Sequence, residues 1–196
     1  MDTLRIYFDT NVLQYASYIL KDKTFNDILV TGRSESFSQK TDNLGERWVN
    51  NVKALRFILD VDDQLPFIFL TSKLTLAEIQ QAPQDKKERM FEFYEILLKY
   101  SNAQNWPRPP IPLPQPKRGT LAILRSILPH ENDAKHAYFS MLRRCNVFMT
   151  CDYKSILNYR KELEMIGVNA KSPYDLVVSI YGKELWERGA GLAIIM

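Results

Sequence analysis

Residues 4–15 have the sequence Leu-Arg-Ile-Tyr-Phe-Asp-Thr-Asn-Val-Leu-Gln-Tyr, which predicts a buried strand that runs directly into a helix. The apolar run Ile6-Tyr-Phe8 is typical of a parallel strand that is covered on both faces. Thr10 and Asn11 are favourable helix N-caps, and the apolar residues after them recur at helical spacing. Asp9 is thereby placed at the carboxyl edge of a sheet, where open α/β folds bind ligands. Capping of the helix is the alternative role for this carboxylate.

The composition is that of an ordinary globular chain. With 196 residues, of which 45% are hydrophobic and 25% charged, it is long enough for one domain with its own core, and we expect a single domain over residues 1–196. The net charge of +3 is compatible with a polyanionic partner but does not identify one. Two cysteines are too few for a disulfide framework. We expect a cytoplasmic protein without a secretory segment or a membrane span.

Strands and helices alternate along the rest of the chain, which predicts an α/β fold with a mostly parallel sheet covered by helices. Further buried strands are predicted at 66–71, 146–151 and 168–173, and amphipathic helices at 48–59, around 74–79, and at 85–102, 132–145, 156–166 and 174–186. A polar excursion at 22–46 and a proline-rich insert at 106–118 interrupt this order. The insert contains six of the ten prolines, so we expect a stiff connector, with a partner-binding PxxP segment as the alternative.

Four acidic residues are expected to converge at the carboxyl edge of this sheet. Asp133 lies in the first turn of a helix whose expected N-cap is Asn132, and Asp152 follows the next strand. The helix descends about 20 Å at 1.5 Å per residue, and the strand returns about 20 Å at 3.3 Å per residue, so both acids finish at one edge. Asp9 ends a parallel strand at that edge. Glu78 lies in the first two turns of the helix after the second strand.

Four carboxylates in one pocket repel each other unless a cation lies among them. Oxygen donors suit Mg²⁺ or Mn²⁺ rather than zinc, and such a metal activates water and neutralises charge on a phosphoryl oxygen. Without metal, at least one of these carboxyls is expected to hold its proton well above the usual pKa of about 4. Thr150 is expected to bind a water or a carboxylate there. His136, one turn below Asp133, is assigned to the surface or to packing.

Four sequence motifs contain these acids. They are Arg-Ile-Tyr-Phe-Asp-Thr-Asn-Val-Leu at 5–13, Leu-Thr-Leu-Ala-Glu-Ile at 74–79, Asn-Asp-Ala-Lys-His-Ala at 132–137 and Phe-Met-Thr-Cys-Asp-Tyr-Lys-Ser-Ile at 148–156. Together they resemble the PIN-domain family. The resemblance implies a three-layer sandwich with a parallel sheet of about five strands, and RNA cleavage with a divalent metal. It also implies catalytic, metal-binding roles for Asp9, Glu78, Asp133 and Asp152, and supporting polar roles for Asn11, Thr150 and Ser155.

The expected activity is therefore that of an Mg²⁺- or Mn²⁺-dependent endoribonuclease, with the toxin of a toxin–antitoxin pair as one expected role. A catalytically silent PIN-like module that binds RNA or another protein is the alternative. A phospho-acceptor domain is a third candidate, which the single acid after the first strand disfavours. RNA is the expected partner, contacted by Lys117, Arg118 and Lys154 near the acidic edge. An inhibitor protein and a second copy of the chain are further candidate partners.

Overall fold

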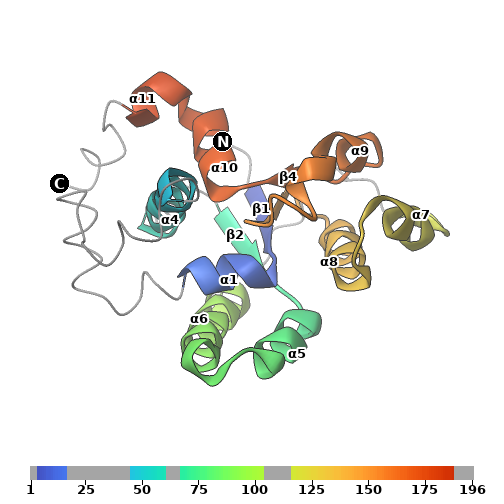
Figure 1. Ribbon diagram of the computed structural model, residues 1–196, viewed down its shortest axis with the longest axis horizontal. Helices are drawn as coiled ribbons and strands as arrows, with labels where there is room; N and C mark the ends of the chain where they lie inside the picture. The colour runs from blue at the N-terminus through green and yellow to red at the C-terminus, as the bar shows by residue number, and fades with distance from the viewer. Residues whose placement is uncertain (1–3, 17–44, 61–66, 104–115, 188–196) are drawn as a thin grey trace.

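The computed structural model describes residues 4–16, 45–60, 67–103 and 116–187, which form a four-stranded, all-parallel sheet with helices on both faces (Figure 1). The elements in chain order are β1 (Leu4–Phe8), α1 (Thr10–Ala16), α4 (Gly45–Asp60), β2 (Phe67–Leu70), α5 (Lys73–Gln81), α6 (Gln84–Ala103), α7 (Thr120–Ile127), α8 (Glu131–Leu142), β3 (Val147–Met149), the 3₁₀ helix η1 (Leu157–Tyr159), α9 (Arg160–Met165), β4 (Ala170–Lys171), α10 (Pro173–Tyr181) and α11 (Lys183–Glu187).

Strand β1 lies inside the sheet, whose order is β2-β1-β3-β4. Ile6 of β1 is in register with Phe69 of β2 and with Val147 of β3. β2 lies on one side of β1, and β3, the next strand along the chain, lies on the other side. The direction in which strands are added to the sheet therefore reverses between β1 and β3. Ligands bind at this switch point in open α/β folds. Asp9 follows β1 there, and its backbone N–H donates to the Met149 carbonyl at 3.0 Å.

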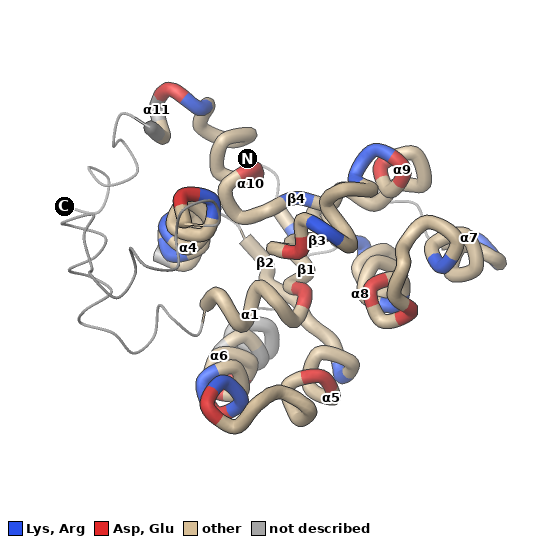
Figure 2. Tube along the Cα trace, in the orientation of Figure 1, with Lys and Arg blue, Asp and Glu red and all other residues tan. Residues whose placement is uncertain are grey.

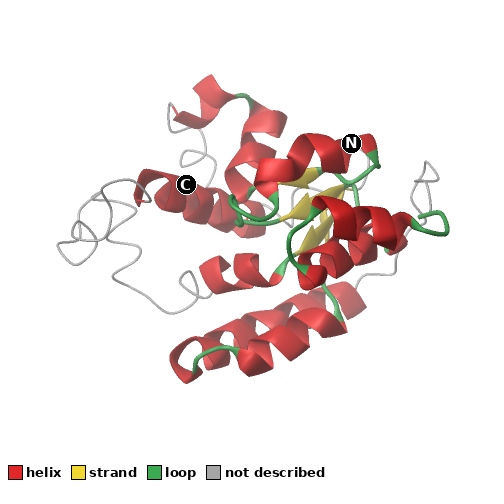
Figure 3. Cartoon of the chain, turned by 45° about the vertical axis from the view of Figure 1, so that its right-hand side comes forward, coloured by secondary structure: helices red, strands yellow, loops and turns green. Residues whose placement is uncertain are grey.

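The side chains of β1 alternate between two hydrophobic cores, one on each face of the sheet. Ile6 and Phe8 belong to the core beneath α1, α4, α6 and α10, whereas Tyr7 belongs to the core beneath α7, α8 and α9. Figures 1 and 3 show these two groups of helices on opposite sides of the strands. Because all three side chains are fully buried, β1 reads as a continuous apolar run rather than as an alternating one.

The predicted α/β class, the parallel sheet and the covering helices are confirmed, and the arrangement is consistent with three layers. The described residues contain four strands, where about five were expected. Most of the polar excursion at 22–46 lies outside the described residues, and its last two residues begin α4. Most of the proline-rich insert, residues 106–115, also lies outside them. None of the helices in the described ranges is both long enough and apolar enough to cross a bilayer.

Several predicted helix boundaries are wrong. Helix α8 begins at Glu131 with His130 as its N-cap, so Asn132 is not the cap and its amide is available for another contact. The helix predicted at 174–186 is two helices, α10 and α11, because Gly182 between them adopts a φ of 82°. The helix predicted at 156–166 begins as the 3₁₀ turn η1. Helix α7 covers residues 120–127, for which the sequence pattern predicts no element.

Candidate functional site

Asp9 is held rigidly between the end of β1 and the start of α1. Its side chain is almost completely buried. The backbone N–H of Thr10 donates to Oδ1 at 2.7 Å, and the Thr150 hydroxyl donates to Oδ2 at 2.8 Å. Burial raises the pKa of the Asp9 carboxyl, and the positive field of His136 and the hydrogen bond from Thr150 act against that rise. Both oxygens are therefore oriented before any ligand arrives.

Glu78 reaches the same place from α5 and is half-buried. Its Oε1 accepts a hydrogen bond from the Asn132 amide at 2.8 Å, and its Oε2 accepts one from the Thr10 hydroxyl. The Nε2 of His136 lies 3.0 Å from Oε2. Burial opposes ionisation of this carboxyl, but the hydrogen bonds from His136 and Thr10 outweigh it and lower the pKa of Glu78.

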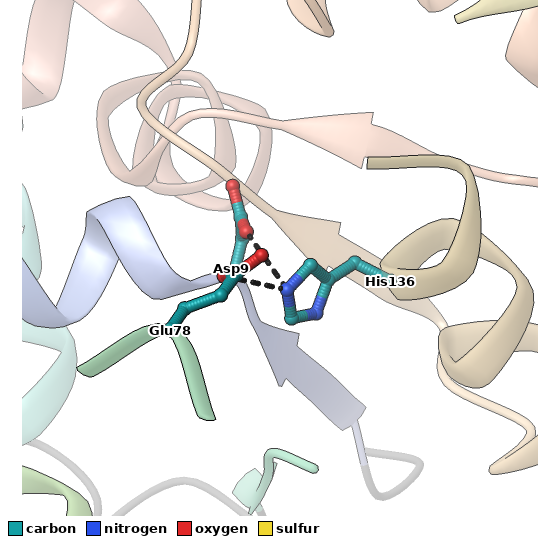
Figure 4. Close-up of side chains that lie close together, drawn as sticks. All are labelled: Asp9, Glu78 and His136. Carbon is teal, nitrogen blue, oxygen red and sulfur yellow. Dashed lines mark hydrogen bonds and ion pairs between the residues drawn. The ribbon is translucent and has the colours of Figure 1, made fainter. Parts of the chain in front are cut away.

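His136 is buried between these acids and a tyrosine of the sheet; it is only 1% exposed. Its Nδ1 lies 2.9 Å from the Tyr7 hydroxyl, which donates its own proton to Ser72 Oγ at 2.7 Å. The Tyr7 oxygen therefore accepts from an Nδ1–H group, and Nε2 is directed at the acids. Nε2 is 3.0 Å from Glu78 and 3.9 Å from Oδ1 of Asp9 (Figure 4). Burial lowers the pKa of His136, but the hydrogen bond to Glu78 and the charge of Asp9 raise it above its usual value.

His136 was assigned to the surface or to packing. It is buried, so the surface role is wrong, and its contact with Glu78 makes it a site residue that the sequence analysis missed. The spacing contained a usable signal, because residues three apart on a helix lie on one face. His136 follows Asp133 by three residues on α8. A histidine one turn below an acidic candidate therefore faces the same pocket.

Asp133 has a side-chain oxygen with no partner. Its Oδ2 is buried and makes no hydrogen bond to any described residue. Burial, together with the negative charges of Asp9 and Asp152, raises the pKa of Asp133 to about 6. The direction of this shift is the one expected for these acids, but burial contributes more to it than the neighbouring charges. Asp133, Asp9 and Glu78 line one cavity of about 280 Å³.

Asp152 lies beside this cavity rather than in its wall. Its Oδ1 accepts hydrogen bonds from the backbone N–H groups of Lys154 at 3.0 Å and Ser155 at 2.7 Å, and its own N–H donates to the Thr150 hydroxyl at 3.1 Å. It is close enough to Asp133 for its charge to act on that carboxyl. Ser155 is buried and supports Asp152 through its backbone.

Asn11 and Thr150 join α1 to the end of β3. The Asn11 side-chain oxygen accepts a hydrogen bond from the backbone N–H of Cys151 at 2.8 Å and lies 3.3 Å from the Thr150 hydroxyl. Thr150 was expected to bind a water or a carboxylate, and its contact with Asp9 confirms the carboxylate. These two polar residues fix the spacing between the two strand ends that carry Asp9 and Asp152.

Three residues of this arrangement have the donor atoms and the close spacing that a metal site requires. Asp9, Glu78 and His136 each present one donor atom, and these atoms lie within 4.8 Å of one another. Asp133 lines the same cavity, but it is not one of the three residues whose donor atoms lie this close together. The sequence argument for Mg²⁺ or Mn²⁺ over zinc assumed oxygen donors alone, whereas an imidazole nitrogen lies within reach here. A mixed nitrogen and oxygen set suits Mn²⁺ and also makes the argument against zinc weaker.

The basic residues predicted to contact RNA do not line this cavity. Lys117 and Arg118 are exposed immediately before α7, and Lys154 is exposed in the turn after Asp152. The one lysine among the residues that line the cavity is Lys86, near the start of α6. Figure 2 shows acidic positions after β1 and β3 and on α5 and α8, and basic positions on α6.

Comparison with known proteins leaves this geometry as the main guide to function. No protein-family model, curated protein or solved structure matches the chain.

Proposed function

We propose that this chain is a PIN-like, divalent-metal-dependent endoribonuclease. The observation that carries the proposal is the convergence of three predicted acids from three distant segments. Asp9, Glu78 and Asp133 come from the end of β1, from α5 and from the start of α8, and they line one cavity. The resemblance of the four motifs to the PIN-domain family implies acids in this order along the chain that converge at one site for RNA cleavage.

The residues present fit a bound divalent cation. The orphaned Oδ2 of Asp133 is a buried acceptor that lacks a donor among the described residues, and buried acceptors normally have one. Asp9 and Glu78 supply two further carboxylates, and His136 supplies a nitrogen. A cation held by Asp9, Glu78 and His136 would place a positive charge in the cavity that Asp133 also lines, and would reduce the mutual repulsion of the acids. Mg²⁺ and Mn²⁺ match the predominance of carboxylate oxygen.

In the proposed reaction, the residues around the acids orient the acids, and Asp133 releases its proton when the cation binds. Thr10 and Thr150 orient Asp9, and Asn132 and His136 orient Glu78. Asp133 must lose its proton to act as a ligand, so binding of the cation is coupled to proton release. When bound, the metal would lower the pKa of a water molecule and neutralise charge on an oxygen of the phosphate whose phosphorus atom the water attacks.

Cleavage of a 5′-labelled RNA is the test of this proposal. The wild type should cut the RNA in Mn²⁺ or Mg²⁺ and stop when a chelator is added. The labelled upstream fragments should end in a 3′-hydroxyl, and the unlabelled downstream fragments should begin with a 5′-phosphate. Asp9→Asn should remove at least 99% of the activity, about 2.7 kcal/mol of transition-state stabilisation. Asp85→Asn, an exposed acid on α6, is the matched control and should keep wild-type activity. Cleavage that persists in Asp9→Asn, or that resists the chelator, would refute the proposal.

A further inference from the structure

The cavity that contains the acids continues past them towards α6. Beyond Asp9, Glu78 and Asp133, its wall includes the turn Ala82–Pro83 and Lys86 and Met90 of α6. Met90 is buried and belongs to the core, so it forms an apolar floor. Helix α6 packs against both α1 and α5, which carry or adjoin the acids. The position of this second half of the cavity is therefore fixed relative to the first.

Lys86 has no anionic partner among the described residues, and it lines a cavity whose opposite wall is acidic. Its backbone N–H is anchored to the Pro83 carbonyl at 3.0 Å, which fixes where its side chain leaves the helix. The side chain is half-buried, yet its ammonium makes no ion pair or hydrogen bond with a described residue. Lys87 is equally buried and follows it on α6, but does not line the cavity. Lys86 is therefore placed to bind an anionic group of a ligand. The same ligand can reach Asp9, Glu78 and Asp133 on the opposite wall through a bound metal cation.

We propose that the α6 half of the cavity binds the nucleotide adjacent to the scissile phosphate of a single-stranded RNA. Lys86 contacts the backbone phosphate of that nucleotide, and the apolar floor at Met90, with Ala82 and Pro83, contacts its sugar and base. The volume of about 280 Å³ is just below the usual range of ligand pockets, so the cavity has room for about one nucleotide beside the acids. This inference rests on the proposed ribonuclease function. It adds that the RNA extends from the acids towards α6.

A single phosphate contact has a measurable signature. Removing one lysine–phosphate contact weakens binding at all sequences alike and lowers the steepness of the salt dependence, by about 0.7 in log–log slope for a single strand. A lysine that only balances the charge of the acids would change the affinity for the metal instead. The two roles are therefore separable.

The experiment compares Lys86→Gln with Lys87→Gln, which removes the neighbouring charge from the same helix. Binding of a fluorescent single-stranded RNA is measured by anisotropy in Ca²⁺ at three salt concentrations, and cleavage kinetics are measured in Mn²⁺. Lys86→Gln should weaken RNA binding about five-fold and lower the log–log slope of affinity against salt concentration by about 0.7. In the cleavage assay it should raise KM and leave kcat nearly unchanged. Lys87→Gln should change each quantity less than two-fold.

The outcomes separate this inference from the proposed function. If the wild type cleaves RNA and the two variants behave alike, the inference is refuted and the ribonuclease proposal stands. If the wild type binds RNA without cleaving it and Lys86→Gln alone weakens binding, the binding site stands and the ribonuclease proposal falls. A chain that neither binds nor cleaves RNA refutes both. A loss of Mn²⁺ affinity in Lys86→Gln with an unchanged salt slope also refutes the inference.

Discussion

Replacing Asp133 with asparagine should stabilise the metal-free protein, although it removes a charged residue from the site. The pKa of Asp133 is raised to about 6 in the folded protein, from the usual value of about 4, because burial and the charges of Asp9 and Asp152 penalise its ionised form. The folded state therefore binds this proton more tightly than the unfolded state. The ionised carboxylate costs stability at all pH values above about 6, and the cost fades as the pH falls from 6 towards 4.

The size of the effect follows from the pKa difference. Roughly two pKa units at about 1.4 kcal/mol each give about 3 kcal/mol. Because the side chain is partly exposed, solvent screening reduces this to about 1–2 kcal/mol. For a chain of this length, that corresponds to an increase of about 3–6 °C in Tm at pH 8.

Thermal and urea unfolding in chelator at pH 8 and pH 4 would measure it. Asp133→Asn should be more stable than the wild type at pH 8 and equal to it near pH 4. Asp85→Asn is the matched control, because Asp85 also lies in the first turn of its helix, α6, and is exposed. It should lose about 0.3–1 kcal/mol through the helix dipole. An Asp133→Asn variant no more stable than the wild type at pH 8 would show that Oδ2 is not buried against other acids.

Three further changes test the contacts around the acids. His136→Gln should narrow the preference for Mn²⁺ over Mg²⁺ in calorimetric titrations, because the imidazole nitrogen favours the softer ion; an unchanged ratio would show that Nε2 is not a ligand. Tyr7→Phe removes the shared partner of His136 and Ser72 and should cost about 1–3 kcal/mol in urea unfolding, whereas a cost near zero would contradict the hydrogen-bond chain. Thr150→Val leaves Oδ2 of Asp9 without its donor and should weaken Mn²⁺ binding measurably, which equal affinities would disprove.

The parts of the fold that depend on local pattern were predictable from the sequence. Burial on both faces gives β1 its unbroken apolar run, and the change to Asp9 and helix caps marks its end. The alternation of strands and helices then predicts a parallel sheet, and simple length arithmetic brings Asp133 and Asp152 to the edge where Asp9 lies. The division of the last predicted helix into α10 and α11 at Gly182 was harder to predict, because one glycine within an apolar helical pattern is often tolerated.

The contacts that complete the site were not predictable in the same way. Asn132 was predicted to cap helix α8, but the helix begins at Glu131 and is capped by His130. The side-chain amide of Asn132 instead donates to Glu78, 54 positions away in the chain. The role of His136 depends on Tyr7, whose side chain points to the α8 face only because of its register in the sheet. Lys86 belongs to a basic cluster typical of a solvated helix face, and only the packing of α6 places it in the cavity wall.

Divalent-metal binding by the acids at the carboxyl edge is the property that both proposals require, and Mn²⁺ binding measures it most directly. Chelator-treated protein at pH 8 would be titrated with Mn²⁺, with the unbound ion followed by electron paramagnetic resonance. The wild type and Asp85→Asn should bind Mn²⁺ with equal affinity, and Asp9→Asn should bind it at least ten-fold more weakly, a difference of about 1.4 kcal/mol or more. Absence of binding in the wild type, or equal binding by Asp9→Asn, would contradict a metal centre built on Asp9, Glu78 and Asp133.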